Sequence, residues 1–274
     1  MSGVNISGGN RNIPGICTNS LQYLNIPVSV LVYWVTMVQK FVKLEYRSSP
    51  QDLTTHERVQ DLVRLAFEAV APFRTFSAYR AKRNYEGVYP FRNLDAQVEF
   101  ESLLEGQFLL QLDWENAATA VTAQPFRAHW DSGEQVRSHI PDYFCRLTNG
   151  DGLVVDVRPE ERVDDAAREA FEFTRRLCEE VGWEYRIYGT PSTHLISNLR
   201  VFKQYASFEC DDKYMANTLR AAARKISITD LISFGTSQEV SGGVTRSLIY
   251  RLLWERRLQT DWYRPLSSAT EVWA

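Results

Sequence analysis

Apolar residues recur along the chain with a period that changes from segment to segment. A 3.6-residue period predicts helices, and alternation or a short apolar run predicts strands. The predicted helices of the first two thirds are Thr54–Ala71, Leu94–Trp114 and Asp164–Val181. The predicted strands are Phe126–Trp130, Ser138–Arg146, Leu153–Arg158 and Trp183–Tyr188. This succession of helices and strands predicts an α/β fold.

Beyond residue 197 the pattern becomes helical, and we expect a second domain there. The predicted helices are Asn198–Tyr205, Lys213–Lys225, Thr229–Phe234 and Thr245–Arg256, with a loop at Gly235–Gly243. Residues 1–20 are rich in Gly, Asn and Ser, which is typical of disorder. The sequence therefore predicts an N-terminal extension at 1–50, partly disordered, a main domain at 51–197 and a C-terminal module at 198–274.

Composition and charge narrow the class of protein. The chain has 274 residues, 44% of them hydrophobic, and a formal charge of −3, so it carries no overall basic field. Four cysteines without metal-ligand spacing indicate reduced thiols in a cytoplasmic protein. The apolar run Ile26–Val38 is shorter than the roughly 20 residues of a membrane span. We read it as a buried strand or short helix and expect no membrane partner.

Two carboxylates occupy an unexpected position in the predicted helix Leu94–Trp114. Glu101 and Glu105 are four residues apart, so they share a helix face. Helical geometry places Glu105 with the apolar stripe, where an unpaired carboxylate is costly. The sequence leaves two interpretations open, a buried salt bridge or a ligand for a metal ion or water.

A second charged group falls on the predicted hairpin. Asp156 interrupts an apolar strand, and Asp142 lies on the partner strand. Pairing about a five-residue loop, Thr148–Gly152, places Asp142 opposite Arg158 and diagonal to Asp156, all on one sheet face. Two carboxylates at this spacing repel each other unless a cation lies between them. Arg158 supplies one positive charge, and a divalent cation would accept the oxygen ligands.

Two segments carry candidate contacts to nucleic acid. Between Pro72 and Phe91 basic and aromatic residues alternate, a pattern that suits phosphate contact and base stacking. The alternative is a solvated loop with a few packed rings. The C-terminal part has eleven Lys and Arg against seven Asp and Glu from Arg200 to Arg264. Its helices form either a bundle that packs on the main domain or a winged-helix-like module. In the second case Thr245–Arg256 is the recognition helix and Leu258–Pro265 turns into the wing. The candidate DNA contacts are Arg80, Lys82, Arg83, Arg246 and Arg251.

The charged positions match a known motif. Pro141-Asp142 followed by Asp156-x-Arg158 resembles the PD-(D/E)xK nuclease motif, with arginine where lysine is usual. The wider sequence, over roughly residues 70–265, resembles TnsA-like heteromeric transposase endonuclease subunits. The runs that carry this resemblance are Glu101-Ser-Leu-Leu-Glu105, Gln124-Pro-Phe126, His139-Ile-Pro-Asp142, Val155-Asp-Val-Arg-Pro159 and Gly182-Trp-Glu-Tyr185.

The resemblance implies a fold and a site. The fold would be a PD-(D/E)xK restriction-endonuclease-like core, a central mixed sheet flanked by helices, followed by the winged-helix-like module. Glu105, Asp142 and Asp156 would bind Mg²⁺, with Mn²⁺ as a substitute, and the carbonyl oxygen of Val157 would join them. Arg158 would take the position of the usual lysine, and Gln124 matches a recurring glutamine of the family.

The resemblance also implies partners. They would be double-stranded DNA, a TnsB-like DDE transposase subunit and an ATPase regulator. Arginine is always protonated, so Arg158 would orient water and stabilise charge rather than act as a base. The alternatives are a stand-alone restriction or repair nuclease and a non-catalytic DNA-binding or assembly subunit that has kept the fold. His139 is expected to be a packed or hydrogen-bonded core histidine rather than a ligand.

Overall fold

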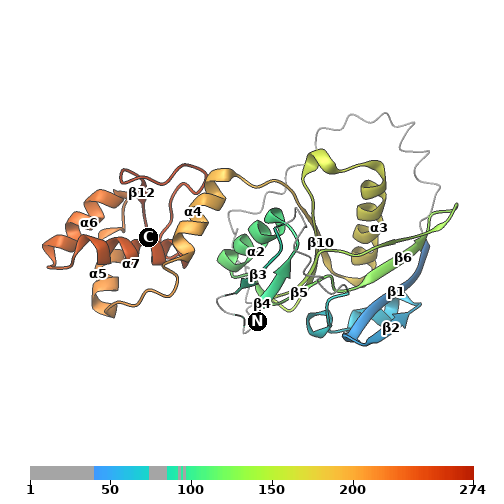
Figure 1. Cartoon of the computed structure of the whole chain (residues 1–274). Helices are drawn as coiled ribbons and strands as arrows, with labels where there is room; N and C mark the ends of the chain where they lie inside the picture. Colours follow the sequence, from blue (N-terminus) through green and yellow to red (C-terminus); the bar gives the residue numbers. More distant parts are fainter. Residues whose placement is uncertain (1–39, 74–84, 92–93, 95–96) are drawn as a thin grey trace, which may run out of the picture. The chain divides into compact units, whose positions relative to one another are not determined.

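The computed structural model describes residues 40–73, 85–91, 94 and 97–274. The chain divides by its internal contacts into residues 1–38 and 39–274, and every described residue belongs to the second unit. That unit has mixed α/β architecture with several sheets (Figure 1). Within the described ranges no helix is both long and apolar enough to cross a bilayer. The predictions for residues 1–20 and for Ile26–Val38 lie outside the described residues.

The sheet that positions the charged residues has the strand order β10-β9-β8-β5. β5 is antiparallel to β8, β8 is antiparallel to β9, and β9 is parallel to β10. One sheet face packs against the cluster that contains residues of α2, and the other packs against residues of α3. The elements are α2 (Leu103–Glu115), β5 (Ala118–Ala123), β8 (Tyr143–Leu147), β9 (Gly152–Val157), α3 (Asp165–Val181) and β10 (Glu184–Tyr188). A mixed sheet between helices therefore confirms the α/β prediction.

The hairpin between β8 and β9 has a shorter loop than predicted. Leu147 N–H donates to Asp151 O at 2.8 Å, and Gly150 N–H donates to Leu147 O at 2.9 Å. Gly150 has φ +91°, the left-handed conformation that ends a three-residue hairpin loop. The register is therefore Tyr143 with Val155, two residues away from the predicted one. A shift of two keeps the parity, so each side chain stays on its predicted face.

A second sheet has the order β2-β1-β6-β7 and overturns two predictions. The predicted helix Thr54–Ala71 is wrong, because that segment forms part of β2 and two short 3-10 helices, η1 and η2. The predicted strand Ser138–Arg146 is broken at Pro141, which cannot donate to a ladder, so its two ends enter different sheets. The elements are β1 (Lys40–Ser49), β2 (Asp52–His56), η1 (Val59–Arg64), η2 (Phe67–Ala69), β6 (Arg127–Asp131) and β7 (Val136–His139). Because β1 begins at Lys40, the predicted extension 1–50 includes a strand of this sheet.

The predicted helix Leu94–Trp114 starts later than expected. Gln97–Phe100 form strand β4, which pairs with β3 at Gly87–Pro90. α2 begins only after Ser102, whose side chain accepts a hydrogen bond from the Glu105 N–H as a helix N-cap. Glu105 consequently lies in the first turn of α2, and Val98 belongs to a strand rather than to the same helical stripe.

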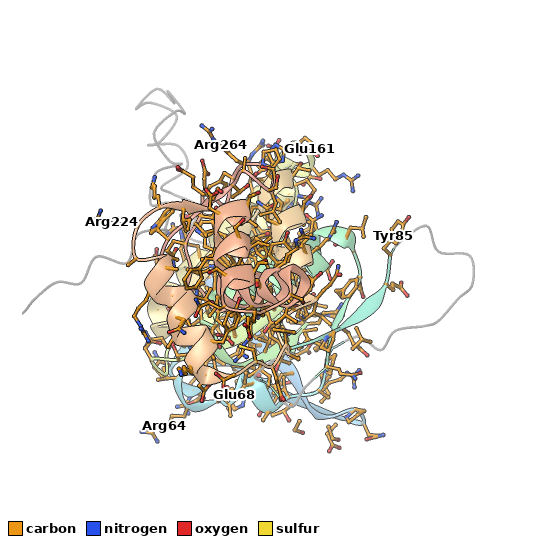
Figure 2. The ribbon with its side chains drawn as sticks, turned by 90° about the vertical axis from the view of Figure 1, so that its left-hand side faces the viewer. Arg64, Glu68, Tyr85, Glu161, Arg224 and Arg264 are labelled. Carbon is orange, nitrogen blue, oxygen red and sulfur yellow. The ribbon has the colours of Figure 1, made fainter. Side chains whose placement is uncertain are left out.

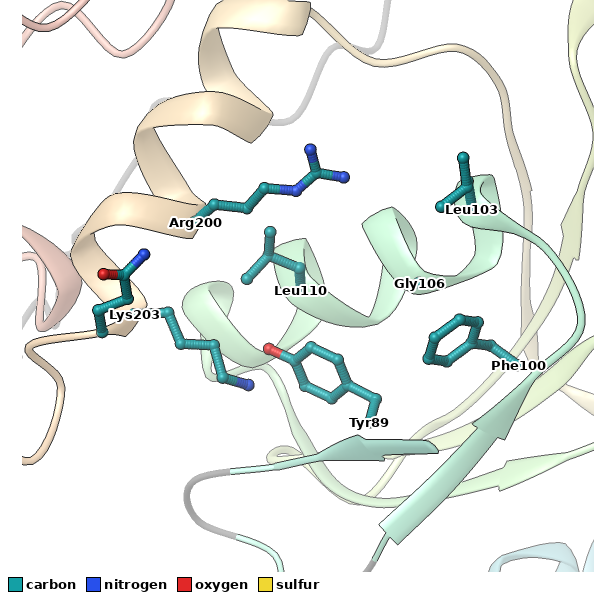
Figure 3. Close-up of a pocket in the computed structure, with 8 residues that line it drawn as sticks. Tyr89, Phe100, Leu103, Gly106, Leu110, Arg200 and Lys203 are labelled. Atoms are coloured by element: carbon teal, nitrogen blue, oxygen red, sulfur yellow. The ribbon is translucent and has the colours of Figure 1, made fainter. Parts of the chain in front are cut away.

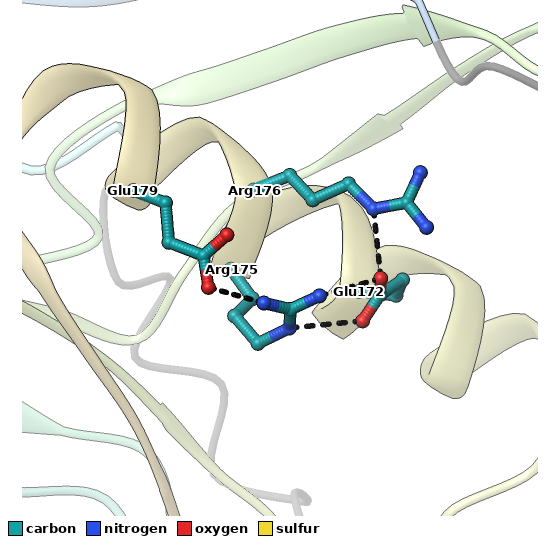
Figure 4. A network of polar contacts seen from close by, with 4 residues as sticks. All are labelled: Glu172, Arg175, Arg176 and Glu179. Carbon is teal, nitrogen blue, oxygen red and sulfur yellow. Dashed lines mark hydrogen bonds and ion pairs between the residues drawn. The ribbon is translucent and has the colours of Figure 1, made fainter.

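Helix α3 follows its sequence closely. Asp164 caps its N-terminus by accepting from Ala167 N–H, and Gly182, at φ +85°, ends it. Glu172 bonds both Arg175 and Arg176, and Arg175 also bonds Glu179, on a partly exposed face (Figure 4). Exposed pairs of this kind stabilise a helix by about 0.3–0.5 kcal/mol each. The capping residues and the period predicted this helix to within one residue at each end.

The C-terminal part is helical, as predicted, with two short strands. After η3 (Glu160–Arg162), α3 and β10 come α4 (Thr193–Lys203), α5 (Asp212–Ala221), β11 (Ile226–Ser227), α6 (Ile228–Ser237), α7 (Gly242–Trp254) and β12 (Glu271–Val272). β11 pairs with β12, and Gln259 forms a bridge with Trp273. A Cβ on Gly235 of α6 would lie 2.2 Å from Thr245 Oγ1 of α7, so glycine allows the two helices to approach closely. The boundary predicted at residue 198 falls inside α4.

Candidate carboxylate site

Four carboxylates, Glu101, Glu105, Asp142 and Asp156, form what we call the carboxylate cluster. It lies at one end of the β10-β9-β8-β5 sheet, where β8 begins and β9 ends, next to the N-terminus of α2. Burial raises the pKa of the Asp142 carboxyl well above its usual range, and the negative charges of Asp156, Glu105 and Glu101 raise it further. The structure thus brings together the three carboxylates that the sequence singled out, with Glu101 beside them.

Asp142 lies at the break between two sheets. Tyr143 pairs with Val155, so extension of the register by one residue places Asp142 across from Asp156 rather than from Arg158 as predicted. Directly opposed like charges destabilise a sheet. The Val157 N–H donates to Asp142 Oδ2 at 2.6 Å, which partly offsets this repulsion. The Val157 hydrogen bond therefore holds Asp142 in place although the neighbouring carboxylates repel its charge.

Asp156 is 1% exposed and lies in the central strand β9. Its Oδ1 is 2.7 Å from His139 Nε2, and its Oδ2 accepts from the Tyr185 hydroxyl at 2.6 Å. His139 is hydrogen-bonded, as predicted, but its partner comes from the other sheet. Tyr185 was not predicted as a site residue, although alternation along β10 places it on the sheet face of Val154 and Asp156. These two partners fix the orientation of a buried carboxylate.

Glu105 takes part in the N-terminal cap of α2, a role that the spacing of Ser102 and Glu105 in the sequence also indicates. Its Oε1 accepts from Ser102 Oγ at 2.8 Å, and its Oε2 accepts from Glu101 N–H at 2.8 Å. Ser-x-x-Glu is a sequence signature of a capping box. The Tyr143 hydroxyl lies 3.3 Å from the same Oε2. Burial and the charge of Glu101 raise the pKa of Glu105. Glu105 therefore interacts electrostatically with the cluster and also caps α2.

Gln124 joins the cluster to the neighbouring strands. Its Nε2 donates to Glu101 Oε1 at 2.9 Å, and its backbone N–H donates to Asp142 O at 2.8 Å. Its φ of 46° lies in the left-handed region, which is unfavourable for a residue with a side chain. Such strain persists only where the surroundings enforce it and is common at functional sites.

Arg158 does not lie as predicted. Its side chain is exposed, and Nε donates to Arg162 O at 3.0 Å in the following 3-10 turn. The register of β8 and β9 extends to place Asp142 across from Asp156, and not from Arg158 as predicted; Arg158 lies just after the end of β9 at Val157. The role of the Val157 carbonyl as a ligand stays a prediction, because the structure shows only the N–H of this residue bonded to Asp142.

The cluster has the chemistry of a Mg²⁺ site without its tight geometry. Its donors are carboxylate oxygens, which Mg²⁺ prefers, and their mutual repulsion is what a divalent cation would relieve. Across the described ranges, however, no three Asp, Glu, His or Cys side chains converge closely enough to hold a metal ion. The oxygens of Asp156 and Glu105 are engaged by protein donors. Metal binding would therefore require the carboxylates to come closer together than they lie here.

Of the five predicted DNA contacts, the structure describes two, Arg246 and Arg251. Arg80, Lys82 and Arg83 lie outside the described residues; Tyr85, which follows them, is 68% exposed (Figure 2). Arg246 is exposed on α7. Arg251 Nε donates to Glu255 and its Nη1 donates to Phe208 O at 2.7 Å, so this guanidinium stabilises the helical part and offers fewer donors to a phosphate than expected.

A pocket of about 330 Å³ is lined by residues other than those of the cluster, although Phe100 and Leu103 are neighbours of Glu101 and Glu105 in the sequence (Figure 3). Its walls come from β3, β4, α2 and α4 and include Tyr89, Phe100, Leu103 and Arg200. Lys203 Nζ lies 3.5 Å from the centre of the Tyr89 ring. Burial lowers the pKa of Lys203, and the nearby Asp113 carboxylate opposes that shift. None of the lining residues belongs to the carboxylate cluster.

Comparison with known protein families and with curated protein sequences gives no match to this chain. The site's interpretation therefore rests on its own residues.

Proposed function

We propose that this chain is a metal-dependent DNA endonuclease whose site is the carboxylate cluster. The observation that carries the proposal is the grouping of buried carboxylates: Asp156 is 1% exposed, and the register of β8 and β9 extends to place Asp142 across from it. Burial and the charges of Asp156 and Glu105 together raise the pKa of Asp142. A protein retains buried like charges at a cost to stability, and strongly perturbed groups of this kind concentrate at functional sites. The resemblance of Pro141-Asp142 and Asp156-x-Arg158 to the PD-(D/E)xK motif supports the same assignment.

Each residue then has a distinct task. Asp142, Asp156 and Glu105 would hold Mg²⁺, which when bound supplies charge stabilisation and a more acidic water to phosphodiester hydrolysis. His139 and Tyr185 orient Asp156. Gln124 orients Glu101 and fixes the backbone of Asp142.

Arg158 is the residue whose assignment depends most on movement. In this structure its Nε is engaged by Arg162 O. To stabilise charge on a phosphate, its guanidinium would have to turn from that carbonyl toward the substrate. Its exposed position leaves room for this change.

The architecture supports the proposal at two points. The sheet β10-β9-β8-β5, with α2 on one face and α3 on the other, is consistent with a restriction-endonuclease-like core. Strand β11 precedes α6, helices α6 and α7 are joined by the short turn 238–241, and β12 follows α7 and pairs back with β11. Gln259, after α7, forms a bridge with Trp273. This order fits a winged-helix-like module with α7 as the recognition helix.

The transposase partner is the most specific part of the proposal. It rests on the resemblance to TnsA-like subunits, which implies double-stranded DNA, a TnsB-like DDE transposase and an ATPase regulator as partners. A non-catalytic DNA-binding subunit is the second candidate. The observation that favours it is that the carboxylate oxygens are already hydrogen-bonded and do not converge.

A cleavage assay separates these functions. Purified protein is incubated with supercoiled DNA and Mg²⁺ or Mn²⁺, with and without a DDE transposase encoded beside its gene. We expect metal-dependent nicking that Asp142→Ala and Asp156→Ala abolish while DNA binding persists, because the carboxylates hold the metal and not the phosphates. Arg158→Lys should retain activity, and Arg158→Ala should lose about 10²–10³ in rate.

The same assay has two adverse outcomes. Cleavage that is unchanged in Asp142→Ala would show that the site is elsewhere. A wild-type protein that never cuts, even beside the transposase, but binds DNA would establish the non-catalytic function.

A further inference from the structure

Phe73 with the two arginines that stack on it forms a cationic feature outside both hydrophobic cores. The guanidinium carbon of Arg127 lies 4.5 Å from the centre of the Phe73 ring, and that of Arg47 lies 5.5 Å from it. Phe73 is 8% exposed but belongs to neither core cluster. We call this arrangement the Phe73 stack.

The stack lies on the polar face of the second sheet. Along β6, Ala128 and Trp130 belong to the core that α3 shares, so Arg127 and His129 face the other way. The acid directly across from Arg127 is Glu45, which is already engaged by Lys43 at 2.6 Å and His129 at 3.0 Å. The Glu45 carboxylate is thus engaged by Lys43 and His129 rather than by Arg127.

Among the residues that the structure describes, Arg127 has no hydrogen-bond or ion-pair partner, and its guanidinium contacts the Phe73 ring. A guanidinium that lies over a ring keeps its in-plane N–H donors free to bind an anion. The ring also restricts the side chain, which lowers the entropy lost on binding. Arg47 is less free, since it donates to Phe73 O and Pro50 O, and it holds the stack together.

The stack is tied directly to the carboxylate cluster. Phe73 N–H donates to Gln124 O at 2.9 Å, and Gln124 N–H donates to Asp142 O at 2.8 Å. The ring is therefore two backbone hydrogen bonds away from the carboxylate that we place at the reaction centre. A phosphate bound by Arg127 would be held at a fixed position relative to Asp142.

We infer that the Phe73 stack is a phosphate-binding element that positions double-stranded DNA relative to the carboxylate cluster, with Arg127 as its phosphate ligand. This inference rests on the proposed function, because it takes DNA as the substrate. Phosphate contacts of this kind fix the register of a protein on a duplex without reading its sequence. In the chain, Phe73 directly precedes the segment that contains Arg80, Lys82 and Arg83.

The test is a binding titration of labelled duplex DNA by fluorescence anisotropy, in a metal chelator and at several salt concentrations. Arg127→Gln should weaken binding about tenfold at low salt, as expected for the loss of a charged hydrogen bond. The slope of log K against log salt should become shallower by about one, the value for one phosphate contact. Arg176→Gln is the matched control. It removes the same charge from the partly exposed face of α3, on the opposite side of the sheet, and should leave both quantities unchanged.

Two further variants test the stack itself. Arg127→Lys keeps the charge but loses the forked donors and the stacking, so it should bind with intermediate affinity. Phe73→Leu changes no charge and should weaken binding, whereas an effect of net charge alone would leave it unaffected. Circular dichroism and thermal melting establish that each variant is folded; Arg127→Lys carries the test if Arg127→Gln does not fold.

The outcomes distinguish this inference from the proposed function. If the wild type binds DNA and Arg127→Gln binds with equal affinity and slope, the Phe73 stack is not a phosphate site, while the nuclease proposal stands. If the wild type binds no DNA at any salt concentration, both are overturned.

Discussion

Replacement of Asp142 by asparagine should stabilise the folded protein while it removes activity. The substitution keeps the shape of the side chain and an oxygen that can accept from Val157 N–H, the 2.6 Å hydrogen bond of the wild type. It removes the charge that burial, Asp156 and Glu105 all disfavour. The free energy of unfolding should therefore rise, as is common when a strained functional group is removed.

The magnitude follows from two opposing effects. Two carboxylates on directly opposed residues, roughly 6 Å apart, repel by about 3 kcal/mol at an effective dielectric constant of 20. Replacing a charged acceptor by a neutral one weakens the Val157 hydrogen bond by about 1 kcal/mol. The net gain is about 2 kcal/mol, which corresponds to roughly 4–8 °C in melting temperature for a domain of this size.

The dependence on pH has a definite sign. The pKa of Asp142 is raised in the folded state, so the folded protein binds this proton more tightly than the unfolded chain does. The stability deficit of the wild type is therefore fully present above the folded pKa. It disappears as the pH falls through that pKa toward the unfolded value. The difference in melting temperature between Asp142→Asn and wild type should be largest at pH 8 and shrink on acidification.

The assay is thermal melting followed by circular dichroism, in a chelator, across this pH range. In a second series, added Mg²⁺ should raise the melting temperature of the wild type more than that of Asp142→Asn. Asp151→Asn is a suitable control, because Asp151 is exposed in the hairpin loop outside the cluster. If Asp142→Asn melts at or below the wild-type temperature at pH 8 without metal, the electrostatic reasoning about the cluster is refuted.

Two further predictions concern the neighbours of the cluster and the helical module. Tyr185→Phe should lower the free energy of unfolding by about 1–3 kcal/mol, because it leaves Asp156 Oδ2 buried without its 2.6 Å donor; chemical denaturation measures this, and an unchanged midpoint would argue against the bond. Gly235→Ala should destabilise the protein by about 1–3 kcal/mol, since its Cβ would lie 2.2 Å from Thr245 Oγ1; a melting temperature equal to wild type would show that α6 and α7 are packed less closely.

The sequence by itself determined the elements whose signals are local. Asp164 and Gly182 bound α3, and both residues stabilise helix ends through their own side chain or backbone. The turn signal at Thr148–Gly152 predicted the hairpin of β8 and β9. The predicted loop of five residues and the observed loop of three are both odd in length, so they give the same parity of pairing. Asp142 and Asp156 could be placed on one face because parity survives a register shift of two residues.

Tertiary structure decided what local signals leave open. The segment Gln97–Phe100 is compatible with a helix, but pairing with β3 makes it a strand; the capping box of Ser102 and Glu105 was the local signal for the later helix start. Contacts between the two sheets depend on how strands that are distant in the sequence pack together. His139 reaches Asp156 across two sheets, and the stacking of Arg127 on Phe73 joins residues far apart in the sequence. No period or motif encodes these contacts, because they depend on packing of the whole chain.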